Sequence, residues 1–498
     1  MSMRIGGLAS GIDTDSIIKD LMKAERMPLD KMEQDKIKME WQRDAFRDIN
    51  KKLLELDNMM LDMKMSRTYN SKQVTSTMPG AVTATGTASS TNGTYNISVQ
   101  RLASSAINVS GTIRIDPNEK LVGQLMMDET IQLEQAISFT TFDKDGNPQT
   151  YEYKIGADDT LKDVISRINT ADNNVRMTLD NNTNQIIMET TRTGKYNPAE
   201  TGNEIIFSNS FFKKGLNLHQ GNETGGDNAE FTYNNAYTVE SRENSYTLNG
   251  ITFQFNNVTA VGESATLTVN NDVDASFDKI MAFVNKYNEV VEELTGSQQE
   301  ERYRDYPPLT KEQMEEMSEK EIELWDEKAK SGLLKGENAI TSGLFDMRQS
   351  WYSTVVNDGQ YSSLTQIGIS TSNNYLDGGK LIVNEDKLKA ALQQDPASVQ
   401  SLFSNSNTDN KRGLVNRLED AVKSTMKRIN QRAGKGTDTL ENYTLGKRMK
   451  DLDNRISSFE DRLVRIEDRY WKQFSAMEKA ISMMNQQSAM LMSNFGGY

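Results

Sequence analysis

A strict apolar repeat near the C-terminus constrains this chain most. Apolar residues recur in steps of four and three from Leu445 to Tyr470 and resume at Phe474 after two consecutive steps of four. Such steps place the apolar side chains on one strip of a helix, and the extra spacing is a stutter that locally unwinds a supercoil. A helix over 445–484 would be about 60 Å long. Because only a strip of it is apolar, we expect a coiled coil, with a helix lying on its own globular core as the alternative.

A second heptad repeat begins after Pro28, which we expect to end or kink a short helix capped by the polar run 13–16. The strip is half polar up to about Gln42 and apolar from Phe46 onward. We therefore expect 46–63 to pack in a stable domain and the earlier half to be held loosely. The heptad positions are Met32, Met39, Phe46, Leu53 and Met60, with Asp35, Gln42, Ile49, Leu56 and Met63 as their companions.

Both repeats predict contacts for assembly. We call the following residues the assembly seam and expect them to mediate self-association through the terminal helices. They are Met32, Met39, Leu445, Met449, Leu452, Ile456, Phe459, Leu463, Ile466, Tyr470, Phe474, Met477, Ile481 and Met484. The tail from Met483 to Phe495 is rich in methionine, whose side chains adapt to irregular partner surfaces, and disorder of this tail in the isolated protein is a compatible alternative.

Between the repeats the apolar period changes from that of a helix to two. Residues 94–99, 251–255 and 265–269 alternate, and Asn92-Gly93 and Asn249-Gly250 are tight-turn signals. Helical spacing returns at 277–294, 340–351 and 418–429. Two capping boxes, Thr310 with Gln313 and Ser318 with Glu321, predict short charged helices.

These patterns predict an α+β multidomain chain with terminal coiled-coil helices, a helical bundle and inserted, mostly β domains in nested order. The helix at 46–63 has the pattern to pack with those at 277–294, 340–355 and 414–432. We predict a leg segment at 1–42, a helical body of 43–75 plus 273–435, a β domain of 76–130 plus 235–272, a second β-rich domain at 131–234, and a coiled-coil leg at 436–498.

Composition and charge argue against most chemistry and several kinds of partner. The chain has no cysteine, so it has neither disulfides nor thiolate nucleophiles, and its one histidine, His219, lies in a Gly/Asn-rich loop. The net charge of −14 disfavours nucleic acid and anionic lipid. No apolar stretch reaches the length of a membrane span, and no signal-peptide h-region opens the chain.

The candidate chemical motifs have simpler explanations. The run 143–147 (Asp-Lys-Asp-Gly-Asn) resembles the start of a calcium loop, but its glycine is misplaced and a hairpin turn explains it. Asp13 and Asp15 fit helix capping. The glycine pairs at 6–7 and 225–226 lack the rest of a phosphate-binding loop. We therefore expect no enzyme activity, no cofactor and no metal site.

Several segments resemble the flagellar hook-associated protein 2 family. The opening 7–14 (Gly-Leu-Ala-Ser-Gly-Ile-Asp-Thr) and 22–28 (Met-Lys-Ala-Glu-Arg-Met-Pro) are similar to the start of that family, and 93–99 to the close of its N-terminal region. Residues 160–169 followed by 185–188 resemble the "IN" motif shared by flagellar axial proteins. Late in the chain the resemblance is carried by Ser363-Leu364, Ile367-Gly368-Ile369, Gly379-Lys380-Leu381, Asp395-Pro396, Val399 and Leu402-Phe403.

The resemblance implies a cap at the distal tip of the bacterial flagellar filament. Family members are exported through the flagellar type III apparatus, so a secreted protein without a cleaved signal peptide is expected. The implied partners are further copies of the chain in a ring, often a pentamer, flagellin, other hook-associated proteins and an export chaperone. The cap would retain flagellin and promote its polymerisation.

Three alternatives stay open at this point. The first is an extracellular adhesin that uses the exposed β domains, the second is another axial hook-associated protein, and the third is a cytosolic coiled-coil scaffold. The charged insert at 297–336 has no counterpart that the resemblance identifies.

Overall fold

The computed structural model describes residues 13–125, 136–199, 202–408 and 412–495. The chain divides into two compact units. The helical unit comprises residues 1–69 and 273–498, and the β unit comprises residues 70–272, which are inserted between the two parts of the helical unit. The expected α+β architecture with an inserted β region is confirmed, whereas the finer division into five parts stays a prediction.

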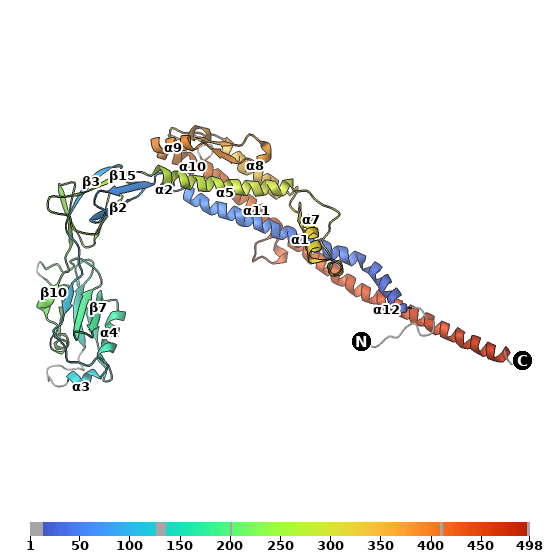
Figure 1. Cartoon of the computed structure of the whole chain (residues 1–498), viewed down its shortest axis with the longest axis horizontal. Coiled ribbons are helices and arrows are strands. Elements are labelled where there is room, and N and C mark those ends of the chain that lie inside the picture. The colour runs from blue at the N-terminus through green and yellow to red at the C-terminus, as the bar shows by residue number, and fades with distance from the viewer. Residues whose placement is uncertain (1–12, 126–135, 200–201, 409–411, 496–498) are drawn as a thin grey trace. The chain divides into compact units, whose positions relative to one another are not determined.

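The helical unit is built around two long terminal helices and a bundle (Figure 1). It contains one two-stranded antiparallel sheet, β16–β17. The elements are α1 (Thr14–Met63), α2 (Ser66–Tyr69), α5 (Val273–Gln299), α6 (Lys311–Glu315), α7 (Glu319–Lys330), α8 (Asn338–Tyr352), η3 (Leu364–Ile367), β16 (Ile369–Thr371), η4 (Tyr375–Asp377), β17 (Leu381–Val383), α9 (Glu385–Gln394), α10 (Pro396–Ser404), α11 (Leu414–Ala433), η6 (Leu440–Asn442) and α12 (Thr444–Phe495).

One hydrophobic core joins the helices of the bundle, as the periodicity predicts. Phe46, Leu53 and Met60 of α1 are fully buried together with residues of α5, α8 and α11. Tyr287 of α5 and Trp351 of α8 meet edge to face, with ring centroids 5.3 Å apart. The core also includes Tyr443, Leu445 and Met449, so the start of α12 belongs to the body of this unit.

α1 corrects one expectation. Asp13 caps the helix as predicted, accepting a hydrogen bond from the Ser16 amide at 3.0 Å. The helix does not end at Pro28, however, and continues from Thr14 to Met63. An interior proline costs about 3 kcal/mol. Ile18 and Leu29, which flank it, are both buried, and burying two such side chains is worth a comparable amount. Packing on both sides of Pro28 therefore offsets its cost.

The β unit contains two hydrophobic cores, each covered by antiparallel sheets. The first β core has sheets with strand orders β1-β15-β3-β11-β12 and β13-β14-β2; the second has β10-β4-β8-β7 and β6-β5-β9. The elements are β1 (Lys72–Ser76), β2 (Val82–Gly86), β3 (Gly93–Arg101), β4 (Ile107–Val109), α3 (Leu121–Leu125), β5 (Ile137–Phe142), β6 (Pro148–Tyr153), α4 (Leu161–Thr170), β7 (Val175–Asp180), β8 (Gln185–Thr190), β9 (Ile206–Phe207), η1 (Phe211–Gly215), η2 (Gln220–Asn222), β10 (Glu223–Thr224), β11 (Ala229–Tyr233), β12 (Tyr237–Ser241), β13 (Ser245–Leu248), β14 (Ile251–Phe255) and β15 (Ala265–Asn271).

Local turn chemistry fixes the register of these sheets. Asn249 and Gly250 both have positive φ, as a two-residue hairpin turn between β13 and β14 requires. The predicted turn at 143–147 joins β5 to β6, and Asp143 Oδ1 accepts hydrogen bonds from the amides of Asp145 and Asn147 at 2.8 and 2.9 Å. The hairpin explanation of this motif is confirmed.

Candidate assembly interface

The first and last helices of the described chain, α1 and α12, pack side by side as an antiparallel pair. The Tyr470 hydroxyl donates a hydrogen bond to the Glu25 carboxylate at 2.9 Å. Closer to the bundle, the Lys36 ammonium lies 2.6 Å from the Asp453 carboxylate, and this hydrogen bond raises the pKa of Lys36. Residue numbers rise along α1 as they fall along α12, which defines the antiparallel direction.

The α12 half of the predicted assembly seam divides into three classes of exposure. The exposed members are Met477 and Met484, whose side chains are 37% and 63% exposed. Glu478, the neighbour of Met477, is half-buried instead. The buried face of α12 therefore shifts by one residue after the stutter. The buried members are Leu445, Met449, Leu452, Leu463 and Ile466, and the half-buried members are Ile456, Phe459, Tyr470, Phe474 and Ile481. Their role in assembly stays a prediction.

The role of the α1 half of the assembly seam, Met32 and Met39, likewise stays a prediction. Met32 and Met39 are half-buried, but the buried apolar residues of this half are Ile18 and Leu29, 3% and 2% exposed. The missed signal is a run in steps of four and three, Ile18, Met22, Glu25, Leu29, Met32, Lys36 and Met39. This run crosses Pro28, and the assumption that proline separates two helices concealed it.

The charged insert packs against the part of α1 whose strip is polar. Gln42 Nε2 donates to the Leu333 carbonyl and to Glu337 Oε1, both at 2.9 Å. The Lys330 ammonium lies 4.7 Å from the centroid of the Trp41 ring. These contacts give the polar strip specific partners, which the sequence did not predict.

The insert has its own small scaffold. The Trp325 indole donates to the Pro307 carbonyl at 2.7 Å, and its ring lies 4.7 Å from that of Tyr306. Both predicted capping boxes are present, at Thr310 and Ser318. An open groove of about 890 Å³ separates the insert from α1. It is lined by Asp20, Lys23, Ala24, Met27, Asp30, Lys31, Gln34, Pro307, Thr310, Glu312, Gln313 and Glu316.

The last turns of α12 extend beyond the start of α1 (Figure 1). Since both helices rise by about 1.5 Å per residue, the register set by Glu25 and Tyr470 places Thr14 opposite about residue 481. The overhang, 482–495, carries large exposed apolar side chains. These are Met483, Met484, Met490, Leu491 and Met492, each at least 51% exposed.

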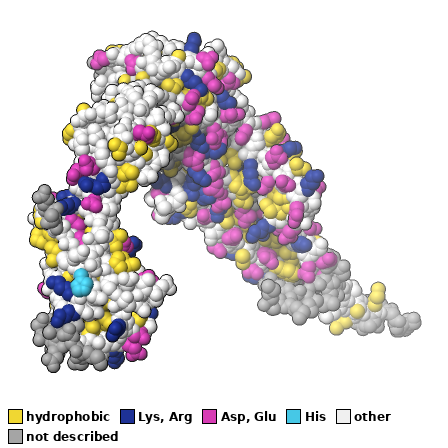
Figure 2. All heavy atoms as spheres, turned by 60° about the vertical axis from the view of Figure 1, so that its left-hand side comes forward, with side chains coloured by type: hydrophobic (Ala, Val, Ile, Leu, Met, Phe, Trp, Pro, Cys, Tyr) yellow, Lys and Arg dark blue, Asp and Glu magenta, His cyan; other side chains and the backbone are white. Residues whose placement is uncertain are grey.

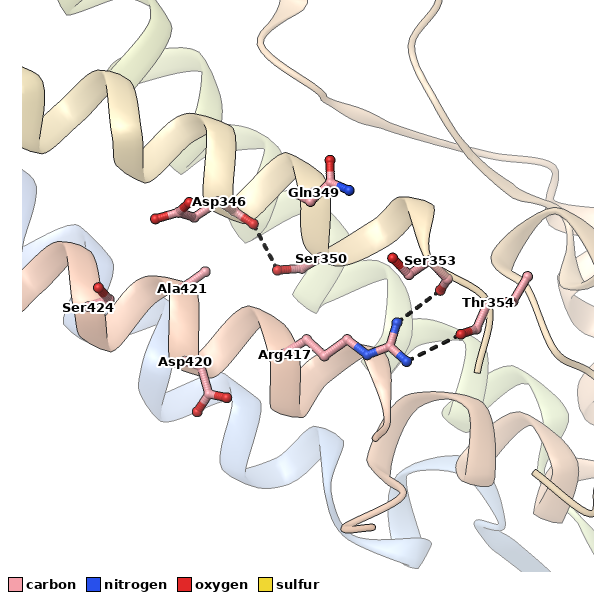
Figure 3. A pocket seen from close by; sticks show the side chains of 9 residues that line it. All are labelled: Asp346, Gln349, Ser350, Ser353, Thr354, Arg417, Asp420, Ala421 and Ser424. Atoms are coloured by element: carbon pink, nitrogen blue, oxygen red, sulfur yellow. Dashed lines mark hydrogen bonds between the residues drawn. The ribbon is translucent and has the colours of Figure 1, made fainter. Parts of the chain in front are cut away.

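A second groove lies between α8 and α11 and has a volume of about 540 Å³. Arg417 of α11 donates to the carbonyls of Ser353, the C-cap of α8, and of Thr354, the residue after it, at 3.0 and 3.2 Å (Figure 3). Burial, with the nearby charge of Arg412, lowers the pKa of Arg417. This arrangement is a helix cap.

The two carboxylates at the rims of this groove are also engaged. Asp346 pairs with Arg428 at 2.8 Å, and Asp420 pairs with Arg412 at 2.9 Å. Each acid therefore has its charge partner within the helical unit, and the groove offers no pair of free carboxylates to a cation.

Other potential chemical sites are sparse in the described part of the chain. His219 lies exposed in a loop of the β unit, with its Nε2 2.8 Å from Asn217 Oδ1. Within the described ranges, no three His, Asp or Glu side chains are grouped to hold a metal ion. No helix in those ranges is long and apolar enough to cross a membrane. Basic and acidic side chains interleave over the helical unit (Figure 2).

Comparison with known proteins gives these helices a family context. Residues 10–106 and 226–486 match the family descriptions "Flagellar hook-associated protein 2 N-terminus" and "Flagellar hook-associated protein 2 C-terminus". A flagellar hook-associated protein 2 of Halalkalibacterium halodurans is 40% identical over 99% of this chain and 100% of its own length. The chain belongs to the flagellar hook-associated protein 2 family. An A-type member from Pseudomonas aeruginosa is 25% identical over 98% of this chain and 96% of its own.

Solved structures show the fold of this family. The crystal structure of the D1-D2-D3 domains of the flagellar cap protein FliD from Escherichia coli superposes with a TM-score of 0.56 at 18% identity. It covers 82% of this chain and 99% of that one. The resemblance noted at 160–169 and 185–188 falls on α4 and β8. Most of the opening 7–14 segment lies outside the described residues.

Proposed function

We propose that this chain caps the distal tip of a bacterial flagellar filament, where it retains exported flagellin and promotes its polymerisation. Its family membership supports this, because relatives named flagellar hook-associated protein 2 align over nearly the whole chain. The helical unit with an inserted β unit is shared with a protein whose title calls it a flagellar cap. None of the comparisons favours the adhesin alternative.

The α12 overhang is the observation that carries the mechanism. A cap must stay bound and yet move as each subunit is added, which requires interfaces of modest strength. Methionine side chains suit such interfaces because they are flexible and polarisable. Met484 and Met490, which lie beyond the start of α1, are 63% and 69% exposed. The overhang, together with the exposed seam residue Met477, therefore makes the exchangeable contacts with the filament.

The finer features of the proposal follow the family resemblance. The chain forms a ring-like homo-oligomer, a pentamer in this proposal, with the β units as its exposed plate. Flagellin, other hook-associated proteins and an export chaperone are its partners. It is secreted to the filament tip without a cleaved signal peptide, and its role is structural, with no enzymatic step.

Deletion of the gene, followed by electron microscopy of the cell surface, tests the proposal. Cells without the chain should carry hooks without filaments and release monomeric flagellin into the medium. Immunogold labelling of the parent strain should place the chain at filament tips. Normal filaments on the deletion strain would refute the proposal.

A further inference from the structure

The two cores of the β unit are connected by two chain segments, 102–106 and 225–228. The Ser104 amide donates to the Asp227 carbonyl at 3.0 Å, so the segments form a narrow two-stranded neck. A neck of this kind can bend unless contacts outside it fix its angle. The loop at 192–197, which we call the clamp loop, provides such contacts.

The clamp loop follows β8 of the second β core and presents a buried ring, Tyr196. The guanidinium carbon of Arg192 lies 3.6 Å from the centroid of this ring, and that of Arg242 lies 4.4 Å from it. Arg242 belongs to the turn between β12 and β13 in the first β core. The Tyr196 ring therefore makes cation–π contacts with one arginine from each core. Arginine is the cation most often found stacked on an aromatic ring in such contacts.

Arg242 also forms hydrogen bonds to two separate segments of the second β core. Its Nε donates to the Lys195 carbonyl at 2.9 Å, and its Nη1 donates to the Lys144 carbonyl in the β5–β6 turn at 2.6 Å. In return, the Thr193 hydroxyl donates to the Arg242 carbonyl at 2.7 Å. Lysine could not reproduce this set, because only the planar guanidinium holds its donors in a fixed fork.

At Gly194 the backbone of the clamp loop lies against the backbone of Arg242 in the first core. The φ of Gly194 is +90°, and a Cβ there would lie 2.5 Å from the Arg242 Cα. The Gly194 amide donates to the Ser104 carbonyl of the neck at 3.0 Å. The clamp loop therefore touches both the neck and the Arg242 turn.

The second β core also holds the clamp loop through hydrogen bonds of its own. Glu204 is only 4% exposed. Its Oε1 accepts hydrogen bonds from the backbone amides of Tyr196 and Asn197, both at 2.8 Å. Glu223 in turn accepts the Glu204 amide at 2.6 Å. Groups of the second β core thus position Tyr196 through contacts that do not involve Arg242.

We propose that Arg242 is a latch that locks the two β cores into one rigid body by engaging the clamp loop at Tyr196. This inference goes beyond the capping role and does not depend on it. Without the latch, the neck would allow the second core to swing relative to the first while each core stays folded.

Distance measurements by pulsed electron paramagnetic resonance test the latch. The chain has no cysteine, so Ala260→Cys in the first core and Ser166→Cys in the second give one nitroxide pair, both at exposed positions. The full chain should give a narrow distance distribution. Arg242→Gln and Tyr196→Leu should each broaden this distance distribution about twofold or more. The reason is that, without the latch, movement of one core relative to the other costs little free energy.

Controls separate the latch from a general charge effect. Arg114→Gln removes an exposed arginine elsewhere in the second core and should leave the distribution unchanged. Arg242→Lys should broaden it, because lysine lacks the fork. Arg242 lies on an exposed turn, so Arg242→Gln decides the question if Tyr196→Leu impairs folding. An Arg242→Gln distribution that superposes on that of the parent would overturn the proposal.

Discussion

The Tyr470 hydroxyl donates a hydrogen bond to the Glu25 carboxylate at 2.9 Å, across 445 positions of sequence. This contact fixes the register of the α1–α12 pair. Tyr470→Phe keeps the ring and removes the donor. Because the contact is partly buried, we expect a loss of about 1 kcal/mol in the local stability of the pair. Hydrogen exchange over 18–32 should accelerate about fivefold, and unchanged exchange would show that the register does not depend on this bond.

Leu29 tests whether α1 is a continuous, packed helix across Pro28. Leu29→Ala removes a side chain that is 2% exposed, which should lower the free energy of local opening by about 2–5 kcal/mol. Leu61→Ala, at a 54% exposed position of the same helix, is the matched control. Hydrogen exchange of the two variants should differ strongly over 18–39. Equal protection would contradict the packing of this half of α1.

Gln42 tests the support that the insert gives to α1. Gln42→Ala removes the hydrogen bond to Leu333 of the insert and the bond to Glu337, which follows the insert, and should cost about 1–2 kcal/mol of local stability. Proteolysis of the insert should become faster, while Gln394→Ala at an exposed position of α9 should have no effect. Equal cleavage rates for the two variants would show that the insert is held by other contacts.

We expect the stability of the helical unit to depend on pH through Glu419. Burial alone would raise the pKa of Glu419, but hydrogen bonds from Lys423 and Lys64 outweigh it and lower that pKa. Since the folded-state pKa lies below the unfolded value of about 4.3, ionised Glu419 stabilises the fold above that value. The stabilisation disappears as pH falls through the lower folded pKa.

The variant Glu419→Gln should therefore be less stable than the parent at pH 7, by about 1–3 kcal/mol, and the difference should shrink toward pH 3. Thermal unfolding between pH 3 and 7 measures it. Glu292→Gln, which breaks the exposed pair with Lys380, should change stability little at any pH. A difference for Glu419→Gln that is constant with pH would contradict the assignment.

Periodicity was sufficient to predict the elements whose burial follows a regular pattern. The strip at 46–63 and the first part of the strip from Leu445 are regular, and both contribute to the helical core. Turn chemistry likewise predicted the hairpin at 143–147 and the caps at Thr310 and Ser318. These features depend on neighbours in sequence, so one segment carries the whole signal.

Features that depend on distant partners were missed. Gln42 is satisfied by Leu333 and Glu337, which lie almost 300 residues away, and no local pattern marks such a contact. Pro28 predicts a helix end or a kink because its cost is local, whereas the packing of Leu29 that offsets this cost comes from tertiary contacts. The engagement of Tyr196 by Arg242 joins two different cores and has no periodic signature.

The most direct test of the capping account is complementation of the deletion strain with the chain lacking residues 482–498. This truncation spares Tyr443, Leu445 and Met449, which belong to the helical core, so the protein should stay folded. Flagellin released into the medium is the measurement. The full chain should restore filaments and reduce the release, whereas the truncated chain should leave hooks bare and the release high. Normal filaments with the truncated chain would contradict the proposal that the α12 overhang makes the capping contacts.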